Sequence, residues 1–204
     1  MSIISSIKSF FQKVYKSIFP GKETVNIVIL GDKGCGKTEL WCRLQGKKNT
    51  ENGGTSKERI DSFTLGKNPS GDNVVVQTSK DIGGGDNWVK DYDELVNCNG
   101  TFIYYLVELT RLDYIAEDTR NRLRKIKSIE RKKKLKDCGI RILATFFDKY
   151  DGDKDKAIKD VKEKIFNKRI MGIEITPQMI QPINTTDWKD INEIKQQILK
   201  SVGK

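Results

Sequence analysis

The chain has 204 residues, of which 36% are hydrophobic, so it is long enough for one domain with a substantial core. It contains no histidine, which excludes histidine-based catalytic triads and metal sites that need imidazole. Lys and Arg number 38 against 28 Asp and Glu, a formal charge of +10 that favours an anionic ligand or partner.

Residues 2–19 place apolar side chains at spacings of three and four, which predicts an amphipathic helix that ends before Pro20. Such a helix either packs permanently on the domain or lies at a membrane interface, and the sequence leaves both open. We therefore divide the chain into an N-terminal amphipathic helix, residues 1–20, and one domain, residues 21–204.

A glycine-rich loop follows an expected strand at residues 25–30 and precedes an expected helix at residues 38–44. The loop matches G-x-x-x-x-G-K-[ST] in full. Its residues are Gly31, Asp32, Lys33, Gly34, Cys35, Gly36, Lys37 and Thr38, and Glu39 comes next. In such a loop backbone N–H groups surround a β-phosphate, the lysine reaches the β- and γ-phosphates, and the hydroxyl ligates Mg²⁺. The loop therefore predicts binding of a nucleoside di- or triphosphate.

Two strands are expected at residues 59–65 and 73–80, joined by the turn-rich residues 66–71. Thr55 stands before them in a polar loop, where its hydroxyl is placed either to contact Mg²⁺ and the γ-phosphate or to lie plainly on the surface.

Asp81 follows the second of these strands and begins the sequence Asp-Ile-Gly-Gly, which ends at Gly84. An aspartate at this point suits the holding of Mg²⁺ through water, and the N–H of Gly84 suits contact with the γ-phosphate. A helix at residues 88–96 and a buried strand at residues 101–109 are expected next.

Residues 120–136 hold ten basic side chains and one acidic side chain, so nearly the whole net charge lies in one expected helix. The segment is either a solvated helix face or a docking surface for an anionic membrane or partner. Nucleic acid ranks below these because the segment lacks the aromatic side chains that stack on bases.

A buried strand at residues 139–147 is followed by Asp148, Lys149 and Asp151, and then by an expected helix at residues 154–166. The carboxylate of Asp151 is suited to accept two hydrogen bonds from a guanine edge, with Lys149 lying along the base.

Asn184, Thr185 and Thr186 follow the last expected strand, at residues 179–183, and precede a final helix at residues 187–202. They are placed for a base-contacting loop. Strands that alternate with helices predict the three-layer α/β/α architecture of P-loop NTPases. We expect a mostly parallel six-stranded sheet with one antiparallel edge strand.

The series of phosphate loop, loop threonine, D-x-G-G, a variant of N-K-x-D and a final polar loop resembles that of Ras-like small GTPases. It is most similar to the Arf and Arf-like branch, which includes the beta subunit of the signal-recognition-particle receptor. The features that point to this branch are the N-terminal amphipathic helix, the two glycines after Asp81 and the hairpin before it. The resemblance covers residues 22–204 and the helix at residues 1–20.

The resemblance implies GTP or GDP with Mg²⁺ as ligands, and effector or regulator proteins as partners. It assigns the metal to Thr38, Thr55 and Asp81, and the catalytic contacts with the γ-phosphate to Lys37 and Gly84. It assigns the base to Lys149 and Asp151, with Asp148 and the loop of Asn184, Thr185 and Thr186 beside them.

The sequence departs from this family at three positions. Gly85 stands where the family has its catalytic glutamine, so hydrolysis should be slow unless Asp86 or Asn87 substitutes. Asp148 replaces an asparagine, so an amide donor becomes an acceptor and guanine preference rests mainly on Asp151. Lys33 occupies a position that is often small, and we expect its side chain to point to solvent.

The leading hypothesis is a GTP-binding regulatory switch with slow hydrolysis. The alternatives are a non-hydrolysing GTP-binding scaffold for protein interaction and, less favoured, a P-loop nucleotide kinase. The kinase ranks third because its arginine-bearing lid has no counterpart in a chain whose arginines gather in one run, and nucleic-acid binding through residues 120–136 ranks fourth because it lacks a recognisable motif.

No apolar run approaches the roughly 20 residues that span a bilayer, and no secretory leader is evident. We expect a cytoplasmic protein with reduced cysteines, attached peripherally to anionic membranes through residues 2–19 and 120–136 if that helix is interfacial.

Overall fold

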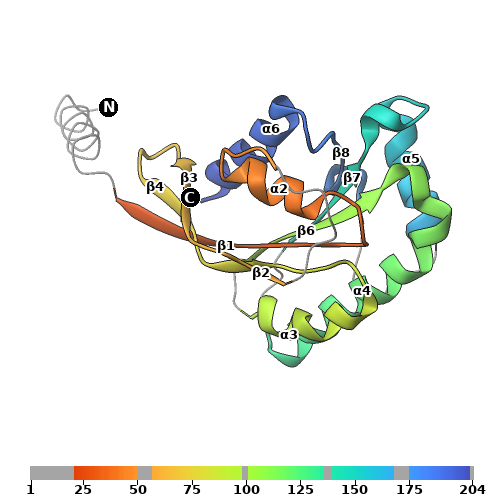
Figure 1. Ribbon diagram of the computed structural model, residues 1–204, viewed down its shortest axis with the longest axis horizontal. Helices are drawn as coiled ribbons and strands as arrows, with labels where there is room; N and C mark the ends of the chain where they lie inside the picture. Colours follow the sequence, from red (N-terminus) through yellow and green to blue (C-terminus); the bar gives the residue numbers. More distant parts are fainter. Residues whose placement is uncertain (1–20, 50–56, 98–100, 136–138, 168–174, 203–204) are drawn as a thin grey trace, which may run out of the picture.

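The computed structural model describes residues 21–49, 57–97, 101–135, 139–167 and 175–202. The expected N-terminal helix and Thr55 lie outside the described residues. Within them, helices cover both faces of a central sheet, which gives three layers (Figure 1). No helix in this part of the chain is both long and apolar enough to cross a bilayer.

The central sheet has six strands, and every neighbouring pair is parallel except the pair of β3 and β4. The strands, in the order in which they lie side by side, are β3 (Phe63–Lys67), β4 (Asn73–Val76), β1 (Lys22–Gly31), β6 (Thr101–Glu108), β7 (Ile140–Thr145) and β8 (Ile180–Pro182). Strand β6 is almost continuously apolar because helices cover the sheet on both faces. The predicted parallel sheet with one antiparallel edge strand is confirmed.

Two apolar cores lie on opposite faces of this sheet. Helices α2 (Lys37–Leu44) and α6 (Trp188–Ser201) pack on one face, and α3 (Tyr92–Leu95), α4 (Leu112–Lys132) and α5 (Lys154–Ile165) pack on the other. The indole of Trp41 anchors the first core and Leu123 of α4 the second, both almost fully buried. The carboxyl ends of β1, β6, β7 and β8 therefore meet at one edge, where ligands bind in open α/β sheets.

The expected hairpin differs from the observed one, because each of its two strands is divided. Residues 59–65 form the end of β2 (Glu58–Ile60) and the start of β3, and residues 73–80 form β4 and most of β5 (Ser79–Asp81). Strand β2 pairs with β5 in a separate antiparallel ladder. The β4–β1 ladder ends with β4. Beyond it the chain contacts β1 through isolated hydrogen bonds, such as that from the Ser79 hydroxyl to the carbonyl oxygen of Ile27 at 3.0 Å.

The helix expected at residues 88–96 is a 3₁₀ helix, Asp86–Asp91, followed by the single turn of α3. The apolar residues Val89, Tyr92 and Leu95 are spaced three apart, which matches the three residues per turn of a 3₁₀ helix.

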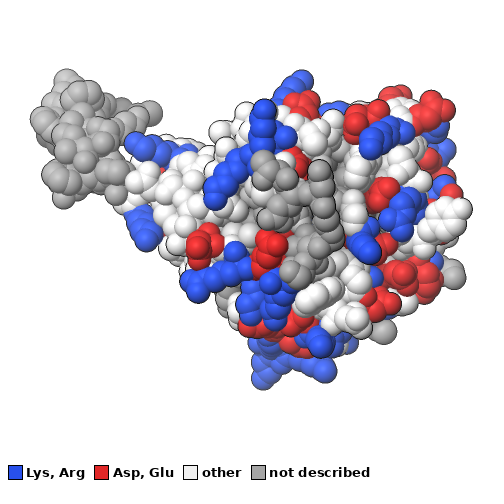
Figure 2. Space-filling view, viewed as in Figure 1, with Lys and Arg blue, Asp and Glu red and all other residues white. Residues whose placement is uncertain are grey.

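The basic segment at residues 120–136 is only in part a solvated face. Arg120 and Arg122 are 7% and 4% exposed, and both turn inward from α4. Six of the basic side chains donate hydrogen bonds or form ion pairs within the domain: Arg120, Arg122, Arg124, Lys125, Lys127 and Lys133. Basic side chains that reach the surface gather below α3 at the lower edge of the view in Figure 2.

Candidate functional site

The phosphate loop joins the end of β1 to the start of α2, as the sequence predicts. Gly31 has φ of 146°, and a Cβ there would lie 2.5 Å from the carbonyl oxygen of Leu106 on β6, so only glycine fits. Gly36 has φ of 94° and stands directly before the first turn of α2. The loop therefore turns back on itself between a buried strand and a helix N-terminus, which is a geometry suited to anions.

Lys37 lies inside the loop, where its side chain crosses from the start of α2 to the opposite limb. The residue is 6% exposed, and its ammonium donates to the carbonyl oxygen of Asp32 at 2.7 Å. The positive charge is thus fixed at the loop and shielded from bulk water, which strengthens its attraction for phosphate oxygens.

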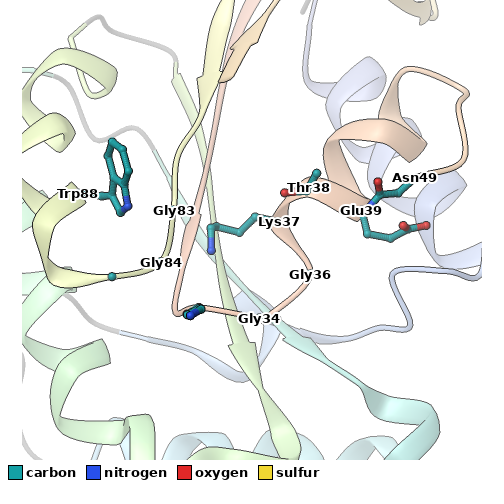
Figure 3. A pocket seen from close by; sticks show the side chains of 11 residues that line it. Gly34, Gly36, Lys37, Thr38, Glu39, Asn49, Gly83, Gly84 and Trp88 are labelled. Atoms are coloured by element: carbon teal, nitrogen blue, oxygen red, sulfur yellow. The ribbon is translucent and has the colours of Figure 1, made fainter. Parts of the chain in front are cut away.

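A cavity of about 600 Å³ opens at this loop (Figure 3). It is lined by the phosphate loop and the start of α2, by Asn49, by Gly83, Gly84 and Gly85, and by Trp88. Its volume lies within the range of small-molecule sites.

Not every residue of the predicted motif lines this cavity. The lining includes Lys33, Gly34, Gly36, Lys37, Thr38 and Glu39, and does not include Gly31, Asp32 or Cys35. Glu39 also pairs with Arg43 at 2.5 Å. Cys35 is fully buried, and burial raises the pKa of its thiol to about 11, so the thiol stays protonated at neutral pH.

Thr38 and Asp81 form the part of the site that suits a metal ion. The Thr38 hydroxyl donates to Oδ2 of Asp81 at 2.6 Å, while Oδ1 of Asp81 is buried without a hydrogen-bond partner among the described residues. Asp81 is 1% exposed, and burial raises the pKa of its carboxyl against the opposing effects of the Thr38 hydrogen bond and the charge of Lys37.

This donor set fits Mg²⁺, which prefers hard oxygen ligands. Within the described ranges no group of three or more Asp, Glu, Cys or His side chains comes together to hold a metal. A hydroxyl and one carboxylate would therefore hold the ion together with water and phosphate oxygens, which is how Mg²⁺ is usually bound at nucleotide sites. Thr55, the third predicted ligand, lies outside the described residues.

Gly84 touches the phosphate loop. A Cβ at this position would lie 2.1 Å from the Asp32 carbonyl carbon and from the Lys33 nitrogen, so glycine is needed for the contact. Gly85, in contrast, has room: among the described residues its Cβ would meet only Trp88, at 4.0 Å. The structure thus places the backbone of Gly84 at the cavity, and leaves the position of the family's glutamine without a side chain.

The loop after β8 also reaches the phosphate loop. Thr185 is buried, and a Cβ on Gly36 would approach its hydroxyl oxygen to 3.1 Å. The carboxamide oxygen of Asn184 accepts from the backbone N–H and the hydroxyl of Thr186, at 3.0 and 2.7 Å. The three residues are therefore a fixed turn beside the start of α2.

Asp148, Lys149 and Asp151 follow β7 at the same edge of the sheet. All three are exposed, and none lines the cavity. The loop that carries them is tied to the end of β8 by the N–H of Phe147, which donates to the carbonyl of Ile183 at 3.3 Å. The structure places them beside the loop of Asn184, and their contact with a base stays a prediction.

Sequence reasoning missed Asn49 and Trp88 in the cavity wall, and it missed Arg122 behind the phosphate loop. The guanidinium of Arg122 contacts Asp86 at 2.9 Å and Asp32 at 3.5 Å. A helical signal for Arg122 exists, because Ile115, Thr119, Arg122 and Ile126 recur at spacings of three and four along one buried face.

Comparison with known proteins supports the fold. No protein-family model and no curated protein sequence matches this chain. The Arl6 BBS3 small GTPase from Trypanosoma brucei, solved with the bound nucleotide analogue GppNp, superposes with a TM-score of 0.59 at 13% identity, over 87% of this chain and 98% of that one. The Methanosarcina barkeri Roco2 RocCORdC structure bound to GDP superposes with a TM-score of 0.53 at 17% identity, over 86% of this chain. This chain spans about half of that Roco2 chain, 47% of which is covered.

The chain has the fold of Ras-like and Arf-like small GTPases. The resemblance inferred from its motifs is confirmed at the level of fold.

Proposed function

We propose that this protein is a guanine-nucleotide-binding switch that needs Mg²⁺ and hydrolyses GTP slowly. The observation that carries the proposal is the pair of Thr38 and Asp81, joined at 2.6 Å beside the ammonium of Lys37. Oδ1 of Asp81 is buried and has no hydrogen-bond partner within the described part of the chain, which is unfavourable for a carboxylate; Mg²⁺ with a polyphosphate would satisfy this oxygen, the hydroxyl and the cation.

GTP and GDP are the nucleotides that the proposal favours. Two structural neighbours were solved with GDP and with the GTP analogue GppNp. Asp151 would accept from the guanine ring N–H and the exocyclic amine, which adenine does not offer on that edge. Effector or regulator proteins would contact the segments whose conformation follows the γ-phosphate.

Slow hydrolysis follows from the cavity wall. Gly85 has no side chain to orient water, and its neighbour in that wall is the apolar ring of Trp88. Asp86, a candidate substitute, is held by Arg122 at 2.9 Å. In this proposal the cavity wall supplies groups suited to binding phosphate, and Gly85 supplies no polar side chain at the position where the family has its water-orienting glutamine.

The test measures binding and turnover together. Fluorescent GDP and GTP are titrated with Mg²⁺ and with EDTA, and single-turnover hydrolysis is followed for the wild type, for Gly85→Gln and for Gly85→Ala. We expect Mg²⁺-dependent binding, slow wild-type hydrolysis, and a rise of about tenfold or more in Gly85→Gln alone. A wild type that binds neither nucleotide contradicts the proposal.

The second candidate is a GTP-binding scaffold that does not hydrolyse, and Gly85 favours it as well. In that case GTP stays intact in both the wild type and Gly85→Gln. A nucleotide kinase is less favoured because Arg120 and Arg122 are buried in ion pairs and hydrogen bonds within the domain, not available in a lid.

We infer that any attachment to anionic membranes depends on residues 2–19 more than on residues 120–136, since six basic side chains of the second segment already have partners within the domain. In sedimentation with phosphatidylserine vesicles, Ile7→Glu combined with Phe11→Glu should release the full chain. Charge reversal at the exposed Arg131, Lys132 and Lys134 should weaken binding less. The opposite order would contradict this inference, and a cytoplasmic location without attachment would leave both variants like the wild type.

A further inference from the structure

The buried Arg122 of α4 contacts two segments that border the phosphate cavity: the phosphate loop, through Asp32, and the segment after Gly84, through Asp86. Its side chain is 5% exposed, and it contacts Oδ1 of Asp86 at 2.9 Å through one terminal nitrogen and Oδ1 of Asp32 at 3.5 Å through the other. A buried guanidinium without carboxylate partners would be strongly unfavourable, so the two acids account for its place inside the domain.

The two carboxylates belong to the two segments that meet where Gly84 packs on the phosphate loop. Asp32 belongs to the loop, and Gly84 packs on its backbone. Asp86 follows Gly84 by two residues. The side chain of Asp32 also accepts from the backbone N–H of Lys33 at 2.8 Å, which links the ion pair directly to the loop backbone. The chain therefore closes a ring from the phosphate loop through Arg122 and Asp86 to Gly84, and back to the loop.

The two ion pairs of this ring differ in their exposure to water. The Asp32 side chain is 17% exposed, whereas that of Asp86 is 85% exposed. If the Gly83–Asp86 segment moves away from the phosphate loop, water can solvate the already exposed Asp86 carboxylate. Arg122 then keeps Asp32 as its partner. The ring can therefore open at the bond to Asp86 without stranding a buried charge.

We propose that Arg122 is a positioning residue: through Asp86 it holds the segment of Gly84 against the phosphate loop and so favours GTP over GDP. The proposal rests on the function proposed above, because the N–H of Gly84 would meet only the γ-phosphate. A ligand with a γ-phosphate then gains from the closed ring, and a diphosphate does not.

Asp86→Asn is the sharpest variant, because Asp86 is exposed and its loss leaves Arg122 paired with Asp32. We expect the affinity for a slowly hydrolysed GTP analogue to fall roughly tenfold, the scale of one charge-assisted hydrogen bond, with little change for GDP. Asp86→Glu, which keeps the carboxylate, should restore part of the difference.

The matched control is Asp93→Asn. Asp93 pairs with Lys125 at 3.5 Å and likewise links α4 to the segment before it, but it is not part of the ring of Asp32, Arg122 and Asp86. This variant should leave both affinities unchanged. A purely structural role for Asp86 would instead lower the thermal stability and reduce both affinities in parallel, and that result would overturn the proposal.

A second readout needs no nucleotide. In the nucleotide-free protein, backbone amides of residues 83–88 should exchange with deuterium faster in Asp86→Asn than in the wild type or in Asp93→Asn. Equal exchange in all three proteins would overturn the proposal, whether or not the wild type binds nucleotide. Failure of nucleotide binding with the expected exchange pattern would instead count against the proposed function alone and support the positioning role.

Discussion

The two ends of the candidate nucleotide site are built differently. At the phosphate end, Lys37 and Asp81 are 6% and 1% exposed, and each is hydrogen-bonded to another residue of the site. At the base end, Asp148, Lys149 and Asp151 follow β7 and are exposed. The side chains at the phosphate end are held by other residues of the chain, and the candidate base-contacting side chains are exposed to solvent.

The difference indicates that the phosphate end is preorganised for a ligand and that the base end is not. Fixed groups at the phosphate end lose little conformational entropy when a ligand arrives, whereas the side chains at the base end must be ordered by the ligand. Mutations at the phosphate end should therefore change affinity for every nucleotide strongly, and mutations at the base end should change the choice among nucleotides more modestly.

The largest expected effect is that of Lys37→Ala. Loss of a cation fixed beside the phosphates should weaken GTP and GDP alike by about a hundredfold or more, because it removes charge-assisted contacts with two phosphates. Titration with fluorescent nucleotides measures this, with circular dichroism to confirm the fold. Lys33→Ala is the matched control, since Lys33 lies in the same loop but is exposed, and its effect should be small. If Lys37→Ala folds and keeps wild-type affinity, Lys37 does not bind the phosphates and the phosphate end is not the preorganised part of the site.

Gly84→Ala and Gly85→Ala separate backbone contact from simple proximity. The first adds a Cβ at 2.1 Å from the backbone of Asp32 and Lys33, which forces the segment off the loop. We expect it to cost roughly 1–3 kcal/mol in the free energy of unfolding and to weaken GTP more than GDP. The second adds a Cβ into open space beside Trp88 and should stay within about 0.5 kcal/mol. Urea unfolding of both proteins measures this. Equal losses of stability would show that the contact between Gly84 and the phosphate loop does not contribute.

At the base end, Asp151→Asn should lower affinity for GTP roughly tenfold while leaving ATP unchanged, because one acceptor for the guanine edge is lost. Asp148→Asn should act in the opposite direction by supplying an amide donor. Competition between GTP and ATP for a fluorescent nucleotide measures both. If Asp151→Asn weakened GTP and ATP equally, the residue would contribute to stability and not to the choice of base.

Much of the fold was predictable because local signals agreed with the global arrangement. The apolar run in β6 indicates a strand that is buried on both faces of the sheet. The glycines in the loop of Gly31 to Thr38 indicate a tight turn that accommodates only glycine at some positions. The divided hairpin was not predictable, because β4 ends where its partner β1 continues without it. That break depends on contacts between strands far apart in sequence.

The site divides in the same way. The proximity of Thr38 and Asp81 was implied by the motif series, in which Thr38 opens the helix after β1 and Asp81 ends β5. Arg122 could not be placed by its charge, because nine other basic residues surround it in residues 120–136 and most such runs are solvated. Only the packing of α4 on the sheet distinguishes an inward arginine from its neighbours, and helical periodicity offers a partial signal.

The smallest expected effect concerns the stability of the nucleotide-free protein. It tests whether the buried Asp81 carboxylate lowers the free energy of unfolding when no ligand is bound. Burial raises the pKa of the Asp81 carboxyl, so the folded protein binds a proton at this group more tightly than the unfolded chain does. Stability should therefore fall as pH rises from the ordinary pKa through the raised one, and stay lower above it.

Asp81→Asn removes the titration and the buried charge. In EDTA and without nucleotide, we expect its melting temperature at neutral pH to exceed that of the wild type by roughly 2–4 °C, or about 1 kcal/mol in a chain of this size. The difference should shrink toward zero in acid, where the wild-type carboxyl is protonated in both states. With Mg²⁺ and GDP present the order should reverse, because the Asp81 carboxylate then gains the metal ion as a partner. Thermal scans across pH under both conditions decide, and an Asp81→Asn protein less stable than the wild type in EDTA at neutral pH would show that the empty phosphate end carries no such cost.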